Sequence, residues 1–323
     1  MRVRGRDRRE RLLAGSRAGR GAVRTGDTTM AARLLEGKPV AAQIRNDIKE
    51  QVRALSERGV RPALTMIRVG EDPGSVVYMR AKAKASDEVG MHSSIVALPQ
   101  ETGEESLKAL LREIAQDINV HGVIVQLPLP VHLDPLRILE LMDPRKDVDG
   151  FHPWNVGRLV MGEPVFLPAT PAGICELLAR NAVDVEGAHV VVLGRSNIVG
   201  KPLANYLSLK RKGLNATVTL CHSFSHNLPD ITRSADILVA AIGSAGFVRG
   251  SMVSPGAVVV DVGTNRVPDQ SSASGTRLVG DVLFDEVREV ASAITPVPGG
   301  VGPMTVAMLL KNTLQACRAL TGG

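Results

Sequence analysis

Ala188-His-Val-Val-Val-Leu-Gly194 runs directly into Arg195-Ser-Asn-Ile-Val-Gly200-Lys-Pro-Leu203, and this stretch decides the fold class. The first half is a short apolar run, typical of a strand that is buried on both faces. The second half is a glycine-rich turn that opens a helix. A strand, a glycine turn and a helix in this order form the context of a dinucleotide-binding unit. Ser196 stands where the second glycine of a G-x-G motif is expected, and similar turns without a nucleotide also occur in α/β folds.

The next apolar run favours one nucleotide over another. Ala216–Cys221 reads as a strand and is followed by His222-Ser223. Sites for NAD usually place an acid here to hold the ribose 2′-hydroxyl, and no acid is present. Arg195 and Ser223 could instead hold a 2′-phosphate, which indicates NADP. We interpret His222 as a polar neighbour of the nucleotide and not as a catalytic base.

Strands and helices alternate along the whole chain from Ala31. Such alternation implies βαβ units and a mainly parallel sheet, and 323 residues suffice for two domains. We therefore predict an α/β protein with an N-terminal domain over 30–169 and a Rossmann-like domain over 170–303. The expected helices cover 39–58, 73–89, 104–118, 134–142, 171–181 and 304–320, and the expected strands cover 63–69, 93–98, 122–127, 188–194, 216–221, 235–243, 256–263 and 280–282.

The predicted helix that begins at Pro73 carries a lysine of interest. Asp72-Pro73-Gly74-Ser75 supplies N-cap chemistry, and Gly90 is a plausible stop. At helical spacing Tyr78, Ala81, Lys82, Ala85 and Val89 share one stripe, and Lys84 falls on the opposite face. A lysine removed from bulk water can transfer protons near neutrality, so Lys82 is a candidate catalytic group. The alternative is a side chain that extends past small alanines into solvent.

Three further polar residues follow predicted strands, where ligands of parallel sheets bind. Gln126 ends the 122–127 run, and Asp147 and Asp149 lie in a loop that ends at Gly150. Gln126 could simply cap a strand, and an Asp before Gly is usually a turn former. Their coincidence with Tyr78 and Lys82 at one sheet edge is the stronger signal for a site.

The net charge of +6 belongs to the first 29 residues, which contain nine arginines and three acids. The remainder has 30 basic and 30 acidic residues, and this neutral body gives no electrostatic footprint for nucleic acid. We expect 1–29 to be a disordered basic leader. It could be a transit peptide, or translation could begin at Met30. Three scattered cysteines suit a reducing compartment and argue against a Cys-based metal site, and no apolar run is long enough to span a membrane.

Six stretches, in order, resemble the methylenetetrahydrofolate dehydrogenase/methenyltetrahydrofolate cyclohydrolase family of the FolD type. They are Tyr78-x-x-x-Lys82-x-Lys84, Gly122-Val-Ile-Val-Gln-Leu-Pro128, Lys146-Asp-Val-Asp-Gly-Phe-His-Pro-x-Asn155-x-Gly-Arg-Leu159, Gly194-Arg-Ser-x-Ile-Val-Gly200-x-Pro-Leu203, Asp261-Val-Gly263 and Pro298-Gly-Gly-Val-Gly-Pro-Met-Thr305. The resemblance runs from about Met30 to the C-terminus and leaves only the leader uncovered.

The resemblance implies roles for individual residues. Lys82 would handle protons and activate water, Gln126 would orient Lys82, Tyr78 would pack on the folate aminobenzoyl ring, and Asp149 would bind the pterin edge. Leu127 and the turn Pro298-Gly299-Gly300 would also contact the substrate. NADP would be held by Gly194, Arg195, Ser196, Ile198, Val199, Gly200, Ser223, Ile242, Gly243 and Thr264. No metal is required.

The same resemblance implies the reaction and the assembly. The substrate 5,10-methylenetetrahydrofolate would be oxidised with NADP+ and the methenyl product hydrolysed to 10-formyltetrahydrofolate, within one-carbon metabolism and purine biosynthesis. Two α/β domains would flank a cleft, the helix 304–320 would complete the first domain, and the protein would be a cytoplasmic homodimer, with the mitochondrial matrix as an alternative location. Other readings are a monofunctional or NAD-preferring dehydrogenase, a nucleic-acid-binding protein that uses the leader, and a regulatory module that binds NADP without catalysis.

Overall fold

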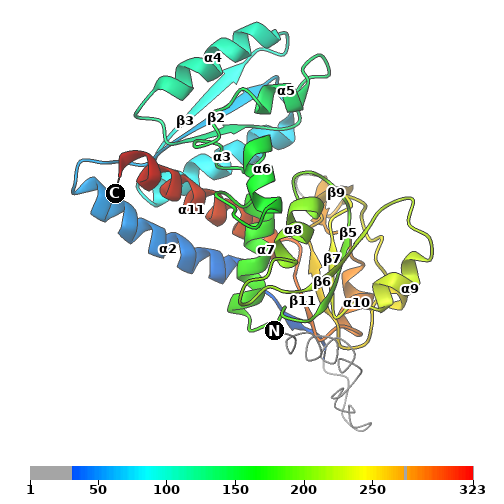
Figure 1. Cartoon of the computed structure of the whole chain (residues 1–323). Coiled ribbons are helices and arrows are strands. Elements are labelled where there is room, and N and C mark those ends of the chain that lie inside the picture. Colours follow the sequence, from blue (N-terminus) through cyan, green and yellow to red (C-terminus); the bar gives the residue numbers. More distant parts are fainter. Residues whose placement is uncertain (1–30, 273–274, 323) are drawn as a thin grey trace, which may run out of the picture. The chain divides into compact units, whose positions relative to one another are not determined.

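A computed structural model describes residues 31–272 and 275–322 (Figure 1). The leader predicted at 1–29 lies outside the described residues. Within the described ranges, no helix combines the length and the apolar character that crossing a membrane requires.

The first sheet has three parallel strands, with β2 (Ala63–Val69) between β3 (His92–Leu98) and β4 (Gly122–Val125). The strands β2 and β4 are almost wholly buried, as their apolar runs predict. Connections between strands contain α3 (Pro73–Glu88) and α4 (Glu104–Gln116), and α5 (Pro135–Leu139) follows β4. The predicted strand 122–127 is too long by two residues. After Val125 the chain turns toward Pro128, which has no N–H to continue the ladder.

The second sheet has six parallel strands in the order β1-β11-β8-β7-β5-β6. Their bounds are Arg33–Leu34 (β1), Ala293–Ile294 (β11), Val258–Asp261 (β8), Ile237–Ala240 (β7), His189–Leu193 (β5) and Thr217–Cys221 (β6). The helices α8 (Gly200–Leu207), α9 (Leu228–Arg233) and α10 (Phe284–Arg288) and the short 3₁₀ helix η1 (Gly250–Met252) belong to the same half. The parallel α/β prediction is confirmed, although β1 and β11 are too short to show a sequence pattern.

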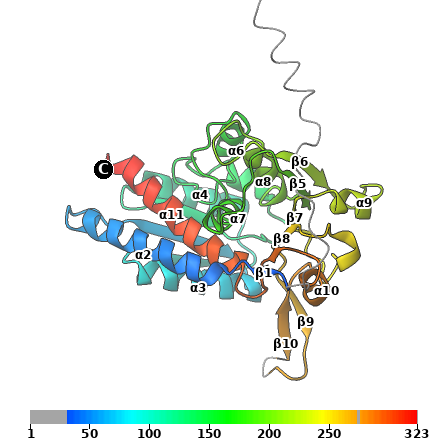
Figure 2. The ribbon, with the colours of Figure 1, turned by 90° about the horizontal axis from the view of Figure 1, so that it is seen from below.

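The predicted strand at 280–282 is wrong. The strand in this region is β10 (Thr276–Val279), which pairs antiparallel with β9 (Asn265–Pro268) in a ribbon that projects downward in Figure 2. Val282 forms only a single bridge with Val248. Gly280 and Asp281 interrupt the apolar run between Val279 and Val282, and Asp281 is instead used in a loop network described below.

Three helices from distant parts of the chain pack on one another: α2 (Gly37–Ser56), α7 (Ala169–Arg180) and α11 (Val301–Thr321). The helix α11 packs along α2 and α7 and also contacts α3, β2 and β4 (Figures 1 and 2). Its apolar residues Leu309, Leu310, Leu314 and Cys317 are buried. The predicted domain boundary between 169 and 170 stays a prediction, and both β1 and α11 pair with elements across it.

Candidate active site

The helix α3 presents one of its two central lysines to the interior. The Asp72 carboxylate accepts a hydrogen bond from the Ser75 backbone N–H at 2.7 Å, as the N-cap pattern predicts. Lys82 is only 9% exposed, and Lys84 is exposed. The predicted stripe is partly wrong: Ala81 is exposed, and Tyr78 is 45% exposed while the neighbouring Met79 is buried in its place. Tyr78 and Met79 are adjacent in α3 and their side chains therefore point in different directions. Met79 points into the core, and Tyr78 lines an open cavity.

Gln126 fixes the direction of the Lys82 side chain. The Lys82 ammonium donates to the Gln126 side-chain oxygen at 3.1 Å, and the Gln126 amide nitrogen donates to the Leu127 carbonyl at 2.8 Å. Because the amide nitrogen is occupied by a carbonyl, its oxygen must face the ammonium. The structure thus brings Lys82 and Gln126 together from two chain segments that are 44 residues apart.

The loop 146–150 separates its two aspartates into different environments. The buried Asp147 carboxylate accepts hydrogen bonds from the His152 backbone N–H and from the Asn155 amide, both at 2.8 Å. These contacts tie the loop to α6 (Pro153–Val160), and burial raises the pKa of Asp147. Asp147 is therefore a structural residue of the loop, in line with the turn-former reading.

Asp149 instead faces the cavity that contains Lys82. Burial raises the pKa of Asp149, and the nearby Lys82 ammonium opposes this effect. Hydrogen bonds to α4 and to α11 also hold the loop 146–150. The Lys146 ammonium donates to the Ile114 and Asp117 carbonyls at the end of α4, at 2.9 and 2.7 Å, and the Asn312 amide of α11 donates to the Val148 carbonyl at 2.8 Å.

Sequence reasoning missed Lys146, Asn155 and Asn312 as supports of this loop. Lys146 and Asn155 stand inside the quoted family motif and could have been found there. Asn312 is a polar residue within an apolar helix face, and that signal was available, but its partner is 164 residues away in the chain.

One cavity of about 300 Å³ joins these residues to the second half of the protein. The four predicted catalytic residues line it, together with Leu127 and three of the predicted cofactor residues. The full lining is Tyr78, Lys82, Val125, Gln126, Leu127, Asp149, Phe151, Ala169, Thr170, Ile198, Val199, Val262, Thr264, Val301, Gly302, Thr305 and Val306. Thr170 and Thr305 were not predicted, and their hydroxyl oxygens lie 3.0 Å apart across α7 and α11.

The predicted turn Pro298-Gly299-Gly300 lies just before this lining and is not part of it. The Gly299 carbonyl accepts the backbone N–H groups of Gly37 and Lys38 at 2.8 and 3.1 Å, which anchors the start of α2. Pro298 is exposed, and Gly300 is the N-cap of α11. The role of the turn in substrate binding stays a prediction.

The glycine turn after β5 requires glycine at two of its positions. Gly194 has a φ of 111°, and a Cβ there would overlap the Ala241 carbonyl oxygen. A Cβ at Gly200 would overlap the Gly194 carbonyl oxygen in the same way. The Ser196 hydroxyl accepts the Val199 backbone N–H at 3.1 Å where the chain enters α8. The two glycines thus permit the tight turn that dinucleotide-binding loops use, while Ser196 accepts the N–H groups of Val199, Gly200 and Lys201 at the start of α8.

Arg195 and Ser223 lie at the carboxyl ends of the adjacent strands β5 and β6, and both are exposed. The Arg195 guanidinium lies 5.9 Å from the centre of the Phe224 ring. Among the described residues, Arg195 forms no ion pair. A guanidinium and a hydroxyl that follow two adjacent strand ends are groups suited to a phosphate. Ile242 and Gly243 follow β7, the neighbour of β5.

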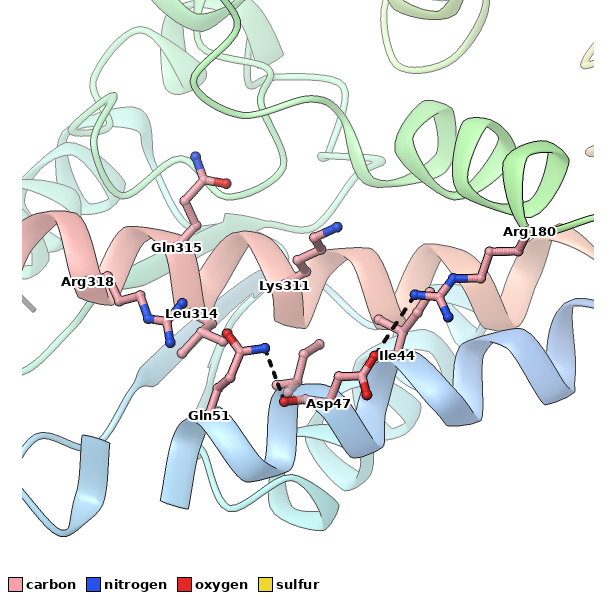
Figure 3. Close-up of a pocket in the computed structure, with 9 residues that line it drawn as sticks. Ile44, Asp47, Gln51, Arg180, Lys311, Leu314, Gln315 and Arg318 are labelled. Carbon is pink, nitrogen blue, oxygen red and sulfur yellow. Dashed lines mark hydrogen bonds and ion pairs between the residues drawn. The ribbon is translucent and has the colours of Figure 1, made fainter. Parts of the chain in front are cut away.

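A second groove, of about 360 Å³, lies away from these residues and is bounded by α2, α7 and α11 (Figure 3). Arg180 and Lys311 line it, and both are ion-paired with acids. The Arg180 guanidinium lies 2.8 Å from the Glu176 carboxylate and 3.9 Å from Asp47, and the Lys311 ammonium lies 3.8 Å from Glu176. No predicted site residue lines this groove. Within residues 31–272 and 275–322, no cluster of three His, Cys, Asp or Glu side chains could hold a metal ion.

Comparison with known proteins decides the family. Residues 35–149 match the catalytic domain of tetrahydrofolate dehydrogenase/cyclohydrolase, and residues 168–321 match its NAD(P)-binding domain. The chain belongs to the tetrahydrofolate dehydrogenase/cyclohydrolase family. A relative from Prosthecochloris aestuarii, named bifunctional protein FolD, is 54% identical over 88% of this chain and 97% of its own.

Solved structures of family members agree with this assignment. The bifunctional FolD enzyme of Campylobacter jejuni is 44% identical, with a TM-score of 0.84 over 90% of this chain and 99% of its own. The FolD enzyme of Trypanosoma brucei, solved with NADP cofactor and an inhibitor, is 41% identical, with a TM-score of 0.86 over 91% of this chain and all of its own. The family resemblance and the two-domain fold predicted from sequence are thereby confirmed.

Proposed function

We propose that this family member oxidises 5,10-methylenetetrahydrofolate to the 5,10-methenyl form with NADP+ and then hydrolyses that product to 10-formyltetrahydrofolate. The observation that carries the proposal is the single 300 Å³ cavity, which joins Lys82, Gln126 and Asp149 to Ile198 and Val199 of the glycine turn. Both family domains match the chain, and both reactions are in the family's name.

Asp149 and Tyr78 are the groups that we assign to folate binding. The amino and ring N–H groups of a pterin are donors, and a carboxylate that faces a cavity is a matching acceptor. Tyr78 offers an exposed ring at the cavity edge, where it can stack on an aminobenzoyl group. Because Asp147 is used internally by Asn155 and His152, Asp149 is the carboxylate of this loop that remains for a ligand.

Lys82 is the group that we assign to proton handling in the hydrolytic step. Water adds to the methenyl carbon, and a proton must leave the water before the ring opens. Lys82 lies in the cavity, is largely removed from solvent and is oriented by Gln126. A positioned proton-transfer group of this kind contributes roughly 10²–10⁴-fold to a rate.

The glycine turn, Arg195 and Ser223 are the groups that we assign to NADP. The glycine turn that leads into α8 suits the pyrophosphate, and Arg195 with Ser223 suits the 2′-phosphate. When bound, NADP+ supplies the hydride acceptor. The role of the protein is to align the methylene carbon of the folate beside the nicotinamide end of that site.

A two-wavelength assay tests this function. The purified protein should form NADPH from 5,10-methylenetetrahydrofolate and NADP+, and it should separately consume added methenyltetrahydrofolate without any nucleotide. A higher kcat/KM with NAD+ than with NADP+ would support the NAD-preferring alternative. NADPH formation without methenyl hydrolysis would indicate a monofunctional dehydrogenase, and NADP binding without either activity would indicate a regulatory module.

We further propose a homodimer in the cytoplasm. The helix α6 and its end expose Trp154, Val160 and Met161, which a second copy could cover. Light scattering on the purified protein, compared with a Met161→Glu variant, tests the dimer. The three free cysteines suit a reducing compartment, and fractionation of cells tests the location.

A further inference from the structure

Asp261 and Asp281 are two buried acids in the nucleotide-binding half that the roles above do not use. Asp261 ends β8 and is 4% exposed, and Asp281 follows β10 and is fully buried. Within the described part of the chain, neither carboxylate has a cationic partner. A buried carboxylate without a counter-ion is costly unless hydrogen bonds compensate it, so their surroundings require an explanation.

Backbone N–H groups take the place of the counter-ion at Asp281. Three consecutive residues donate to its carboxylate: Ile242 at 2.7 Å, Gly243 at 2.9 Å and Ser244 at 2.8 Å. The Asn265 amide donates as well, at 2.9 Å. Successive N–H groups that converge on one anion form a nest, and the anion in turn fixes the conformation of the loop. Asp281 therefore determines the path of residues 242–244.

Asp261 fixes the backbone at Asp281. Its carboxylate accepts the backbone N–H groups of Gly263 at 2.9 Å, Asp281 at 2.8 Å and Val282 at 2.9 Å. Burial raises the pKa of Asp261 to about 6, although these three donors oppose the rise. The two carboxylates thus form a chain of contacts that runs from β8 to the loop after β7.

Two glycines make this arrangement possible. A Cβ at Gly280 would overlap the Asp261 carboxylate, and a Cβ at Gly263 would overlap both the backbone and the carboxylate of Asp281. The motifs Asp261-Val-Gly263 and Gly280-Asp-Val282 are therefore one unit, in which each acid needs the glycine of the other motif. This need also explains why 280–282 does not continue as a strand.

The loops that the two acids hold border the nucleotide site. Val262 and Thr264, on either side of Gly263, line the active-site cavity, and residues 242–244 follow β7 beside the glycine turn. The carboxylates themselves are buried and satisfied by protein donors. We infer that Asp281, held by Asp261, is a positioning residue that sets the 242–244 loop for NADP binding. This inference rests on the proposed function.

The test uses the independence of the two reactions. Methenyl hydrolysis needs no nucleotide, so a defect in the 242–244 loop should leave it unchanged. In Asp281→Asn the new amide N–H₂ would face N–H donors, and we expect the Kd for NADP+, measured by calorimetry, to rise at least tenfold. The KM for NADP+ should rise in parallel, and methenyl hydrolysis should stay within twofold of wild type. Asp285 is an exposed acid on α10, and Asp285→Asn is the matched control. It should leave the Kd for NADP+, the KM for NADP+ and methenyl hydrolysis unchanged.

A milder variant keeps the inference testable if Asp281→Asn does not fold. Asn265→Ala removes one of the four donors to Asp281 and should raise the Kd for NADP+ about two- to fivefold, with hydrolysis unchanged. An unchanged Kd in a folded Asp281→Asn protein, or an equal loss of both reactions in Asn265→Ala, would overturn the inference. A wild type that lacks both activities would instead refute the proposed function, so the two failures can be told apart.

Discussion

Replacement of Lys82 by methionine should remove the hydrolytic activity and leave the fold intact. Lys82 is the only lysine in the described cavity lining, and its ammonium is directed by Gln126 at 3.1 Å. A positioned proton-transfer group contributes roughly 10²–10⁴-fold, which corresponds to about 3–5 kcal/mol of activation free energy. We therefore expect kcat for methenyl hydrolysis to fall by at least a factor of about 100.

The stability of the Lys82→Met variant can be judged from the same contacts. The substitution loses one hydrogen bond with a charged donor, worth about 1.5–3 kcal/mol. It also removes the cost of holding an ammonium at 9% exposure, and methionine fills a similar volume along α3. Gln126 keeps its bond to the Leu127 carbonyl, and its side-chain oxygen faces the cavity. These effects oppose each other, so the free energy of unfolding should change by only about 1–2 kcal/mol.

Lys84→Met is the matched control for this prediction. Lys84 lies on the same helix, two residues away, and is exposed, so the same chemical change there should alter hydrolysis by less than a factor of about two. Stopped-flow decay of methenyl absorbance gives the rates, and urea unfolding gives the stabilities. Wild-type turnover in a folded Lys82→Met protein would refute the role of Lys82, and so would an equal loss in both variants.

Three further perturbations address the nucleotide half. Gly194→Ala should weaken NADP+ binding at least tenfold by calorimetry, because the new Cβ would overlap the Ala241 carbonyl oxygen, and methenyl hydrolysis should persist. Arg195→Ala should lower the preference for NADP+ over NAD+ about tenfold in kcat/KM, and an unchanged preference would place the 2′-phosphate elsewhere. Asp261 should make the folded state less stable as pH rises from 4 to 6. Its pKa of about 6 when folded exceeds its ordinary 3.8, so the folded state binds more protons in this window. This contribution, about 3 kcal/mol, is present below pH 4 and lost through pH 6, and urea unfolding of Asp261→Asn should show a flatter pH dependence there.

Sequence periodicity predicted the long elements because each carries its own hydrophobic pattern. The run Ala63–Val69 is a strand with the predicted bounds, and the Asp72-Pro73 signal places the start of α3. Short elements had no such pattern. Two residues in β1 cannot show alternation, and their pairing with β11 joins positions that are 260 residues apart.

The candidate site was predictable to the level of residue type and sheet edge, but not to the level of side-chain direction. Helical spacing separated Lys82 from Lys84, because these residues point to opposite sides. The same spacing put Tyr78 in the buried stripe, where Met79 lies, since an error of one position rotates a side chain by about 100°. Asp147 and Asp149 are two residues apart in a loop, where no period applies. Only the contacts of Asp147 with Asn155 and His152 reveal which carboxylate is free.

Different hydrogen bonds hold the loop 146–150 and the loop 242–244. Mutations can therefore affect one of the two reactions without the other, even though both use one cavity. The loop that carries Asp149, which we assign to folate binding, is held to α4 through Lys146 and to α11 through Asn312. The loop 242–244 donates its backbone N–H groups to Asp281, a different support. With the roles proposed above, the methenyl product of the first reaction would already lie beside Lys82 when the second begins. A change in the nucleotide supports should consequently slow the first reaction only, whereas a change at Asn312 should move Asp149 and slow both.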